Sequence, residues 1–168
     1  ESSGNTFYPR YFDGMQFHKV VPGKFIQTGS PHYNPLGMPR RVIQDEINAD
    51  FLGLDQQQVM NDSGELNPLL NIHDKNSFQQ ELLSPILDHL GINSESEISD
   101  RQYEVYNLIA NLSLKQAYEI TGYTYTSDLT TRAITRSIVA LANNGPNSNG
   151  PEFFIATSDL PSLSGKHT

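Results

Sequence analysis

The chain has 168 residues, a length that fits one domain. Its 11 basic and 19 acidic residues give a formal net charge of −8, so it lacks the basic footprint that nucleic-acid binding requires. It has no cysteine, which excludes disulfides and thiolate metal sites, and it has no apolar run long enough to span a membrane.

Residues 1–47 are rich in glycine, proline and aromatic side chains. Two short apolar runs, 17–21 and 25–28, flank the dipeptide Pro22-Gly23, a pattern that predicts a strand, a turn and a second strand. The proline-rich segment 30–41 follows and predicts a loop.

Residues 48–126 have a helical pattern instead. Ser77 begins a capping-box sequence, and apolar residues at helical spacing follow it as far as Leu90, with Gly91 as the stop signal. Pro85 lies inside this predicted helix, where we expect it to kink the helix or to shift its start.

A second helix is predicted from Ser99 to Gly122, with its apolar side chains on one face. A shorter helix is predicted over residues 50–60, and the acidic stretch 93–100 is interpreted as a solvated connection. The apolar faces of these helices are expected to form a small core of their own; an interaction surface is the alternative.

Residues 127–168 return to the style of the first segment, with strands predicted over 136–141 and 152–156 on either side of a loop rich in asparagine and glycine. No internal repeat is evident. The sequence therefore predicts a β-rich unit, formed by residues 1–47 and 127–168, that is split by a helical insertion over residues 48–126.

Two distant segments carry the most specific motifs. The first reads Phe-His-Lys-Val-Val-Pro-Gly-Lys-Phe-Ile-Gln over residues 17–27. The second reads Leu-Ala-Asn-Asn-Gly-Pro-Asn-Ser-Asn-Gly-Pro-Glu-Phe-Phe-Ile over residues 141–155 and continues to Leu-Ser-Gly-Lys-His over residues 163–167. Together they resemble the two halves of the cyclophilin active site, where a Phe-His-Arg strand is followed by a Gln.

The resemblance implies an eight-stranded cyclophilin-like antiparallel β-barrel capped by two helices. Compared with that fold, this chain lacks opening and closing strands, so we expect a barrel that is incomplete at both ends and carries a helical insert. The chain does not start with Met and shows no signal-peptide pattern. It is interpreted as a piece whose missing strands lie in the parent protein or in a second chain.

The resemblance also implies peptidyl-prolyl cis–trans isomerisation in the service of protein folding. By position, Lys19 would contact the amide of the isomerising bond, while Gln27 and Asn143 would hold the substrate backbone. The proline pocket and its adjoining groove would be lined by Phe25, Ala142, Glu152, Phe154, Leu163 and His167.

These residue types suit the reaction. Rotation about an X–Pro bond crosses a barrier of about 18–20 kcal/mol and is slow without a catalyst. No nucleophile, metal or cofactor is required, because a protein that binds the twisted amide better than the planar one lowers the barrier. A cation can stabilise the altered amide while an apolar pocket holds the proline ring.

Four positions depart from the family pattern. Lys19 replaces an Arg and loses its planar fork, and Lys24 replaces an aromatic residue of the pocket. Glu152 replaces a Gln and is expected to pair with Lys19 or Lys24. Ser162 stands where many members have Trp or His, which predicts poor sensitivity to cyclosporin-type ligands.

Two alternatives to an efficient isomerase therefore stay open. One is a low-activity module that binds proline segments, and the other is a structural subunit docked into a larger assembly through residues 48–126. The expected partners are proline-containing polypeptides and, through the insertion, another protein. We expect no nucleic acid, no membrane span, no cofactor and no metal. The acidic, cysteine-free composition suggests a bacterial periplasm or cell envelope.

Overall fold

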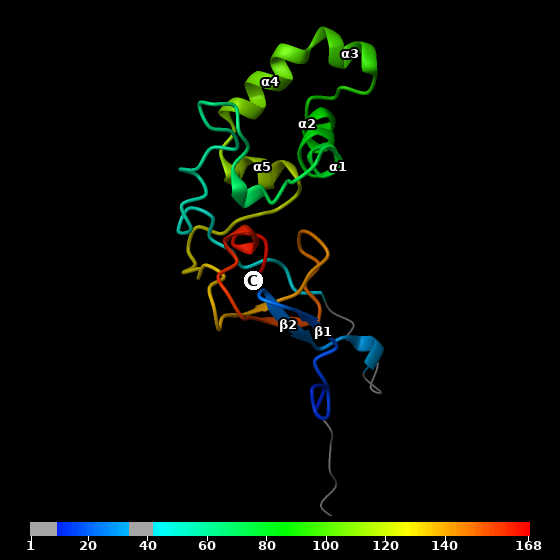
Figure 1. The fold of residues 1–168 in the computed structure, drawn as a ribbon, viewed down its shortest axis with the longest axis vertical. Helices are drawn as coiled ribbons and strands as arrows, with labels where there is room; N and C mark the ends of the chain where they lie inside the picture. Colours follow the sequence, from blue (N-terminus) through cyan, green and yellow to red (C-terminus); the bar gives the residue numbers. More distant parts are fainter. Residues whose placement is uncertain (1–9, 34–41) are drawn as a thin grey trace, which may run out of the picture.

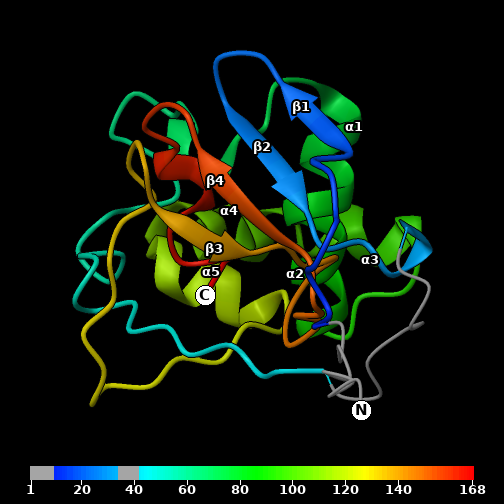
Figure 2. The same cartoon turned by 90° about the horizontal axis from the view of Figure 1, so that it is seen from below.

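The computed structural model describes residues 10–33 and 42–168, so most of the predicted loop over residues 30–41 lies outside the described residues. In Figure 1 the helices gather at one end of the elongated molecule and the β-strands at the other. Figure 2 shows the strands lying across the helices as a separate layer. The chain thus has a helical part and a β part. The boundaries between them, at residues 48 and 126, stay a prediction.

The strands of the described residues form one antiparallel sheet in the order β1-β2-β4-β3. Their bounds are Lys19–Val21 for β1, Phe25–Thr28 for β2, Val139–Leu141 for β3 and Phe153–Ala156 for β4. Gly23 has a φ of 69°, which permits the tight turn between β1 and β2. The predicted strands are confirmed, although β1 and β3 are shorter than the segments that predicted them.

The sheet does not close on itself. β1 and β3 are its two outer strands, and each pairs on one side only within the described residues. The antiparallel pairing that the cyclophilin resemblance implies is therefore present. A complete eight-stranded barrel is not formed by residues 10–33 and 42–168, so closure of the barrel stays a prediction.

Five α-helices follow in the described part of the chain, and none is long and apolar enough to cross a membrane. Their bounds are Lys75–Phe78 for α1, Ser84–His89 for α2, Glu95–Asp100 for α3, Gln102–Asn111 for α4 and Leu114–Ile120 for α5. A π-helical turn, Gln79–Leu83, joins α1 to α2, and short 3-10 turns cover Pro31–Tyr33, Pro68–Leu70 and Pro161–Leu163.

The first predicted helix begins earlier than expected. Asp74, not Ser77, is the cap: its side chain accepts a hydrogen bond from the backbone N–H of Ser77. The π-helical turn ends at Leu83, and Pro85 lies in the first turn of α2, where a residue without an N–H is tolerated. Gly91 follows the end of α2 with a φ of 66°, as predicted.

The second predicted helix is interrupted. α4 ends at Asn111, and Ser113 starts α5 by accepting a hydrogen bond from the backbone N–H of Gln116. The side chain of Gln116 in turn accepts a hydrogen bond from the backbone N–H of Ser113, which completes a capping box. This capping box starts a new helix inside the segment whose apolar face predicted one continuous helix. Gly122 follows α5 and has a φ of 101°, so the predicted end is confirmed.

One predicted helix is absent, and one predicted connection is a helix. Residues 50–60 form turns, bends and two isolated β-bridges; the side chain of the buried Asn48 accepts from the backbone N–H of Phe51 and holds the start of this segment in a turn. The acidic stretch 93–100 is not a simple connection, since Ser94 and Glu97 form a capping box that starts α3.

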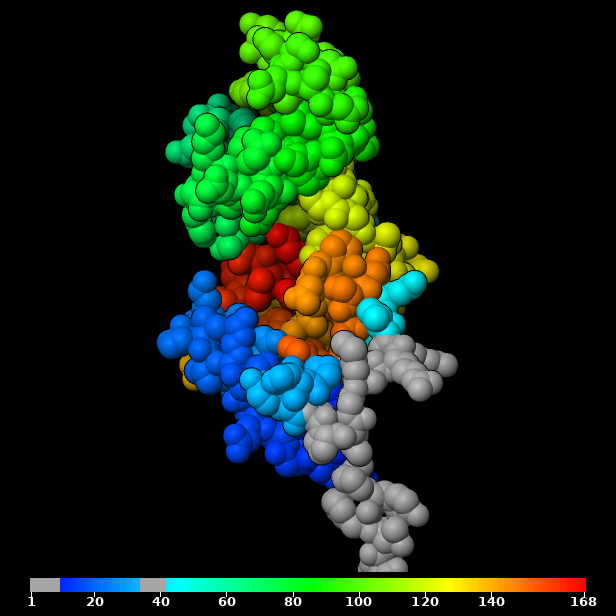
Figure 3. Space-filling model, turned by 90° about the vertical axis from the view of Figure 1, so that its right-hand side faces the viewer, coloured from blue at the N-terminus to red at the C-terminus, as the bar shows by residue number. Residues whose placement is uncertain are grey.

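Each part has its own buried core. In the helical part, Leu82, Ile86 and Leu114 are almost inaccessible to solvent. In the β part, Phe154 packs with Ile134, Leu160 and neighbouring apolar side chains. Figure 3 shows the C-terminal segment (red) directly beneath the helices (green) and the loop before β4 (orange) beneath the chain that follows α5 (yellow). The two segments that carry the long motif are therefore in contact with the helical part.

Candidate active site

Antiparallel pairing places candidate residues from three strands on one face of the sheet. Lys19 on β1 lies opposite Gln27 on β2, and Gln27 lies opposite Phe154 on β4. Residues directly opposite each other in an antiparallel pair project to the same face. Phe25, two residues before Gln27, projects to this face as well.

Three rings form an apolar floor on this face. The ring centroids of Phe25 and Phe154 are 5.3 Å apart. Those of Phe154 and His167 are also 5.3 Å apart, with the rings at 87°. Phe154 is buried and the other two are half-buried, so part of the floor stays open to a ligand. Edge-to-face contacts of this kind stabilise the arrangement of the rings.

His167 contributes a neutral ring to this floor. Its Nδ1 lies 3.0 Å from the carbonyl oxygen of Leu141. A carbonyl oxygen only accepts, so Nδ1 carries the proton and Nε2 is left as an acceptor. Burial lowers the pKa of His167 below its ordinary value of 6.5, which favours the uncharged imidazole at neutral pH.

Lys19 supplies a cation at the edge of the floor. Its Nζ lies 5.5 Å from the centroid of the Phe25 ring, within the range of a cation–π contact. Among the described residues no carboxylate forms an ion pair with Lys19. Its exposed ammonium group can therefore donate hydrogen bonds to a ligand.

The loop between β3 and β4 is held in place by amide side chains. Asn143 Nδ2 donates to the backbone oxygen of Lys166 at 2.8 Å and to Asn149 Oδ1 at 3.1 Å. Asn149 is fully buried and donates in turn to Asp45 Oδ1 at 2.7 Å. Asp45 also accepts from the backbone N–H of Asn147. This network ties the loop to the segment before the helical part and fixes the wall of the site.

Glu152 makes contacts that the sequence did not predict. Its carboxylate accepts a hydrogen bond from the side-chain amide of Gln27, and His18 Nε2 lies 3.8 Å from the same carboxylate. The expected ion pair of Glu152 with Lys19 or Lys24 is absent from the described residues. The register explains this correction, because Gln27 pairs with Phe154 and so lies close to the residue just before β4.

One cavity of about 310 Å³ brings these side chains together. All nine residues selected from the sequence line it, and the roles assigned to them stay predictions: Lys19, Phe25, Gln27, Ala142, Asn143, Glu152, Phe154, Leu163 and His167. Five further residues line the same cavity: Pro31, Asn144, Ser148, Gly150 and Pro151. Four of these lie inside the long motif of residues 141–155, so the motif could have identified them as lining residues. Pro31 follows β2 and belongs to neither motif.

The comparison with protein families decides the identity. A family model described as cyclophilin type peptidyl-prolyl cis-trans isomerase matches residues 4–168. The chain belongs to this family. The match to the cyclophilin model also covers the helical part. From the sequence, residues 48–126 had no recognised counterpart in the common single-domain members of the family.

Individual cyclophilin relatives match over short segments. A peptidyl-prolyl cis-trans isomerase of Arabidopsis thaliana is 58% identical over 31 residues, which cover 18% of this chain and 19% of the relative. Peptidyl-prolyl cis-trans isomerase 9 of Schizosaccharomyces pombe is 60% identical over 30 residues, 18% of this chain and 5% of that protein. A Synechococcus elongatus isomerase is 45% identical over 38 residues, 23% of this chain and 26% of the relative. These matches therefore span about a quarter or less of each relative. No solved structure matches the chain.

Two of the departures from the cyclophilin pattern lie away from the cavity. Lys24 is exposed in the turn between β1 and β2, and Ser162 lies in the 3-10 turn Pro161–Leu163; neither lines the cavity. The described residues contain no group of three or more side chains suited to hold a metal ion.

Proposed function

We propose that this chain catalyses peptidyl-prolyl cis–trans isomerisation on flexible proline-containing polypeptides, without a cofactor. The observation that carries the proposal is the convergence of one cation, two amides and three rings on a single cavity. Membership of the cyclophilin family supports the same reaction. The division into residues 1–47, 48–126 and 127–168 belongs to this proposal.

Substrate binding follows from the shape of the site. The proline ring packs on Phe25 and Phe154, with Leu163 closing the pocket. The side chain of Asn143 is already bonded to Lys166 and Asn149, so its backbone groups are the ones that pair with the substrate. Ala142 and Glu152 border the groove for the adjoining residues.

Catalysis rests on stronger binding of the twisted amide. Twisting localises the nitrogen lone pair, and the ammonium group of Lys19 stabilises the altered amide. Bringing the reaction from tens of seconds to milliseconds requires about a 10⁴-fold gain, or roughly 5–6 kcal/mol. One charge-assisted hydrogen bond supplies about 1.5–3 kcal/mol of this. The grip of the apolar floor on the ring and the backbone contacts supply the remainder.

Exchange spectroscopy by NMR on a short proline peptide tests the proposal directly. We expect catalytic amounts of the protein to broaden the separate cis and trans signals, since exchange between them becomes fast. A peptide with proline replaced by alanine serves as the substrate control. Unchanged cis–trans exchange at saturating protein would reject the isomerase assignment.

A low-activity binding module is the second candidate. The hydrogen bond from Gln27 to Glu152 favours it, because it occupies an amide that the isomerase reading assigns to the substrate. Lys19 favours it too, since an ammonium group cannot form the bidentate contact of an Arg. Proline peptides that bind the cavity without faster exchange would select this candidate.

A structural subunit is the third candidate. Tyr103 and Tyr106 on α4 are 78% and 55% exposed and lie one turn apart, which favours a contact surface on the helical part. Replacing both by Ser leaves the core of the helices intact. Loss of a co-purifying partner with isomerisation retained would support docking through residues 48–126.

A further inference from the structure

A second and larger cavity lies where the helical part meets the site. Its volume is about 670 Å³, compared with about 310 Å³ for the first. The helical part contributes one side through α2, the preceding π-helical turn and α5. Asn144, Gly145 and Lys166 contribute the other, and all three belong to the motif segments. We refer to this cavity as the interdomain cleft.

The interdomain cleft adjoins the candidate active site. Asn144 lines both cavities, so the two meet at one residue of the loop between β3 and β4. A polypeptide extends by about 3.3–3.6 Å per residue when stretched. A chain whose proline occupies the first cavity can therefore reach the cleft within a few residues.

The walls of the interdomain cleft are held together by direct packing. Tyr125 Oη donates a hydrogen bond at 3.0 Å to the backbone oxygen of Gly165. Lys166 Nζ lies 4.5 Å from the centroid of the Tyr118 ring. A Cβ atom built on Gly122 would lie 3.5 Å from Pro146 Cγ, which places the end of α5 against the loop. The cleft thus has a defined shape before any ligand binds.

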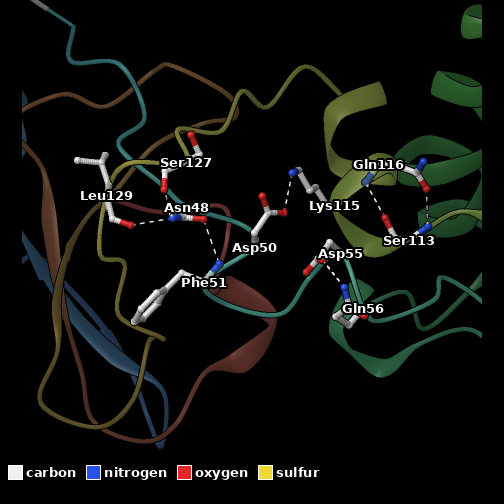
Figure 4. Close-up of polar contacts among 10 residues, drawn as sticks. All are labelled: Asn48, Asp50, Phe51, Asp55, Gln56, Ser113, Lys115, Gln116, Ser127 and Leu129. Atoms are coloured by element: carbon white, nitrogen blue, oxygen red, sulfur yellow. Dashed lines mark hydrogen bonds and ion pairs between the residues drawn. The ribbon is translucent and has the colours of Figure 1, made fainter.

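The connections between the two parts are also fixed, as Figure 4 shows. Asn48 Nδ2 donates to the backbone oxygens of Ser127 and Leu129 at 2.7 and 2.8 Å, joining the chain that enters the helical part to the chain that leaves it. Lys115 Nζ on α5 pairs with Asp50 Oδ1 at 2.6 Å. These contacts join the entering chain to the leaving chain and to α5.

The floor of the interdomain cleft combines apolar surface with one half-buried cation. Leu70, Leu82 and Tyr118 are buried and face the cavity. Lys166 is the cation; burial lowers its pKa, and no carboxylate pairs with it among the described residues. A partly desolvated ammonium group gains from a hydrogen-bond acceptor. A backbone carbonyl of a bound polypeptide provides one.

The rim of the interdomain cleft is acidic. Glu81 and Asp88 are exposed and border the cavity from the helical side. They add two negative charges where the floor has one half-buried positive charge. Complementary potentials favour a ligand that carries a positive charge beyond its apolar anchor.

We propose that the interdomain cleft is a second substrate subsite, which binds an apolar side chain and an adjacent basic residue of the same polypeptide whose proline occupies the first cavity. This inference rests on the proposed function. It makes the preferred substrate a flexible chain in which a proline lies within a few residues of a Leu-Arg type pair.

Peptide binding to the purified protein, measured by fluorescence anisotropy, tests the second subsite. One peptide contains proline alone, and a series places Leu-Arg about two to eight residues before or after the proline, a span set by the length of an extended chain. We expect the best member of the series to bind about tenfold more tightly than the short peptide. Leu-Glu and Ser-Arg versions at the same spacing should lose most of that gain.

Two double variants locate the effect. Glu81→Gln with Asp88→Asn should abolish the preference for Leu-Arg over Leu-Gln, because it removes the acidic rim. Glu95→Gln with Asp100→Asn makes the same charge change on α3, away from the interdomain cleft, and should keep that preference. Thermal unfolding checks that both variants fold as the parent protein does.

The outcomes separate the two proposals. Isomerisation of the short peptide with no preference among the longer ones would overturn the second subsite alone. Tighter binding of the Leu-Arg peptides without isomerisation would overturn the proposed function and keep the subsite as part of a binding module. Equal affinity for a Leu-Arg peptide that lacks proline would also overturn the inference, because the cleft would then serve a separate partner.

Discussion

The side-chain amide of Gln27 on β2 donates a hydrogen bond to the carboxylate of Glu152, the residue immediately before β4. A hydrogen bond to a charged acceptor is roughly twice as strong as one between neutral groups. A substrate backbone that uses the amide of Gln27 must therefore compete with this contact. The pair sets a resting arrangement in which one of the expected substrate-binding groups is occupied.

Glu152→Gln should raise kcat/KM for a short uncharged proline peptide. The neutral amide competes less strongly for Gln27, and the difference between charged and neutral hydrogen bonds predicts a gain of about three- to tenfold. NMR exchange rates at several peptide concentrations measure it. Glu95→Gln on α3 is the matched charge change outside the cavity and should have no effect. A lower rate for Glu152→Gln would show that the carboxylate assists the reaction.

Lys19→Met should lower kcat/KM by about ten- to a hundredfold, the value of one charge-assisted hydrogen bond. Methionine keeps an unbranched stem over the ring of Phe25, so the loss reports on the charge. Lys19→Arg should raise the rate, because a guanidinium fork can make two parallel contacts. Lys24→Met is the control, since Lys24 is an exposed neighbour that does not line the cavity. An unchanged rate for Lys19→Met would remove Lys19 from the mechanism.

The strands and the set of residues that line the first cavity could be predicted from the sequence because both depend on local patterns. The runs around Lys19 and Phe154 are short, apolar and bounded by turn residues, which is typical of strands, and the long motif between β3 and β4 contains much of the cavity wall. Helix boundaries were harder. Asp74 and Ser113 act as caps through side-chain hydrogen bonds, and several Ser and Asp residues in the same region could have served equally.

Contacts between distant segments could not be predicted. The partner of Glu152 depends on the register of β2 against β4, which no local pattern specifies. The interdomain cleft depends on how α5 packs against Gly165 and Lys166, residues far from it in the sequence. Those contacts arise from tertiary packing. The sequence predicted that the helices form a core of their own, but it did not predict which residues join the two parts.

Gly165→Ala should destabilise the protein by about 2–4 kcal/mol, within the range of overpacking plus backbone strain. Its φ is 84°, and an added Cβ would clash with Leu54 Cδ1 in the helical part. Gly91→Ala is the matched control, because Gly91 has a φ of 66° but no atom near the added Cβ. It should cost only about 1 kcal/mol from the left-handed backbone. Denaturant unfolding measures both, and equal losses would contradict tight packing at Gly165.

His167 should make stability depend on pH. Its folded pKa is lowered by burial, so above the unfolded value of about 6.5 both states are neutral and the group has no effect. As the pH falls below that value, the unfolded state takes up the proton first, and the free energy of unfolding decreases until the folded pKa is passed. His167→Gln should therefore flatten the fall in melting temperature between about pH 7 and pH 5. His89→Gln, the same change at an exposed position, should leave it in place. Parallel profiles for the parent protein and His167→Gln would contradict burial of a neutral ring.

Asn48→Ala should be among the more destabilising changes in the chain. Asn48 is 7% exposed, and its side chain donates to the backbone oxygens of Ser127 and Leu129 and accepts from the backbone N–H of Phe51. Its loss removes three hydrogen bonds of a buried side chain, each of which contributes about 0.5–1.5 kcal/mol. Asn111→Ala removes one exposed hydrogen bond and should cost less than about 0.5 kcal/mol.

Asn48→Ala also tests the alignment of the two cavities. If Asn48 holds the connections to the helical part, the variant should lose the preference for Leu-Arg peptides while it still binds the short proline peptide. Asn111→Ala should retain both properties. A variant that is destabilised but keeps the full preference would show that packing of α5 against the loop, without the Asn48 contacts, is enough to align the interdomain cleft.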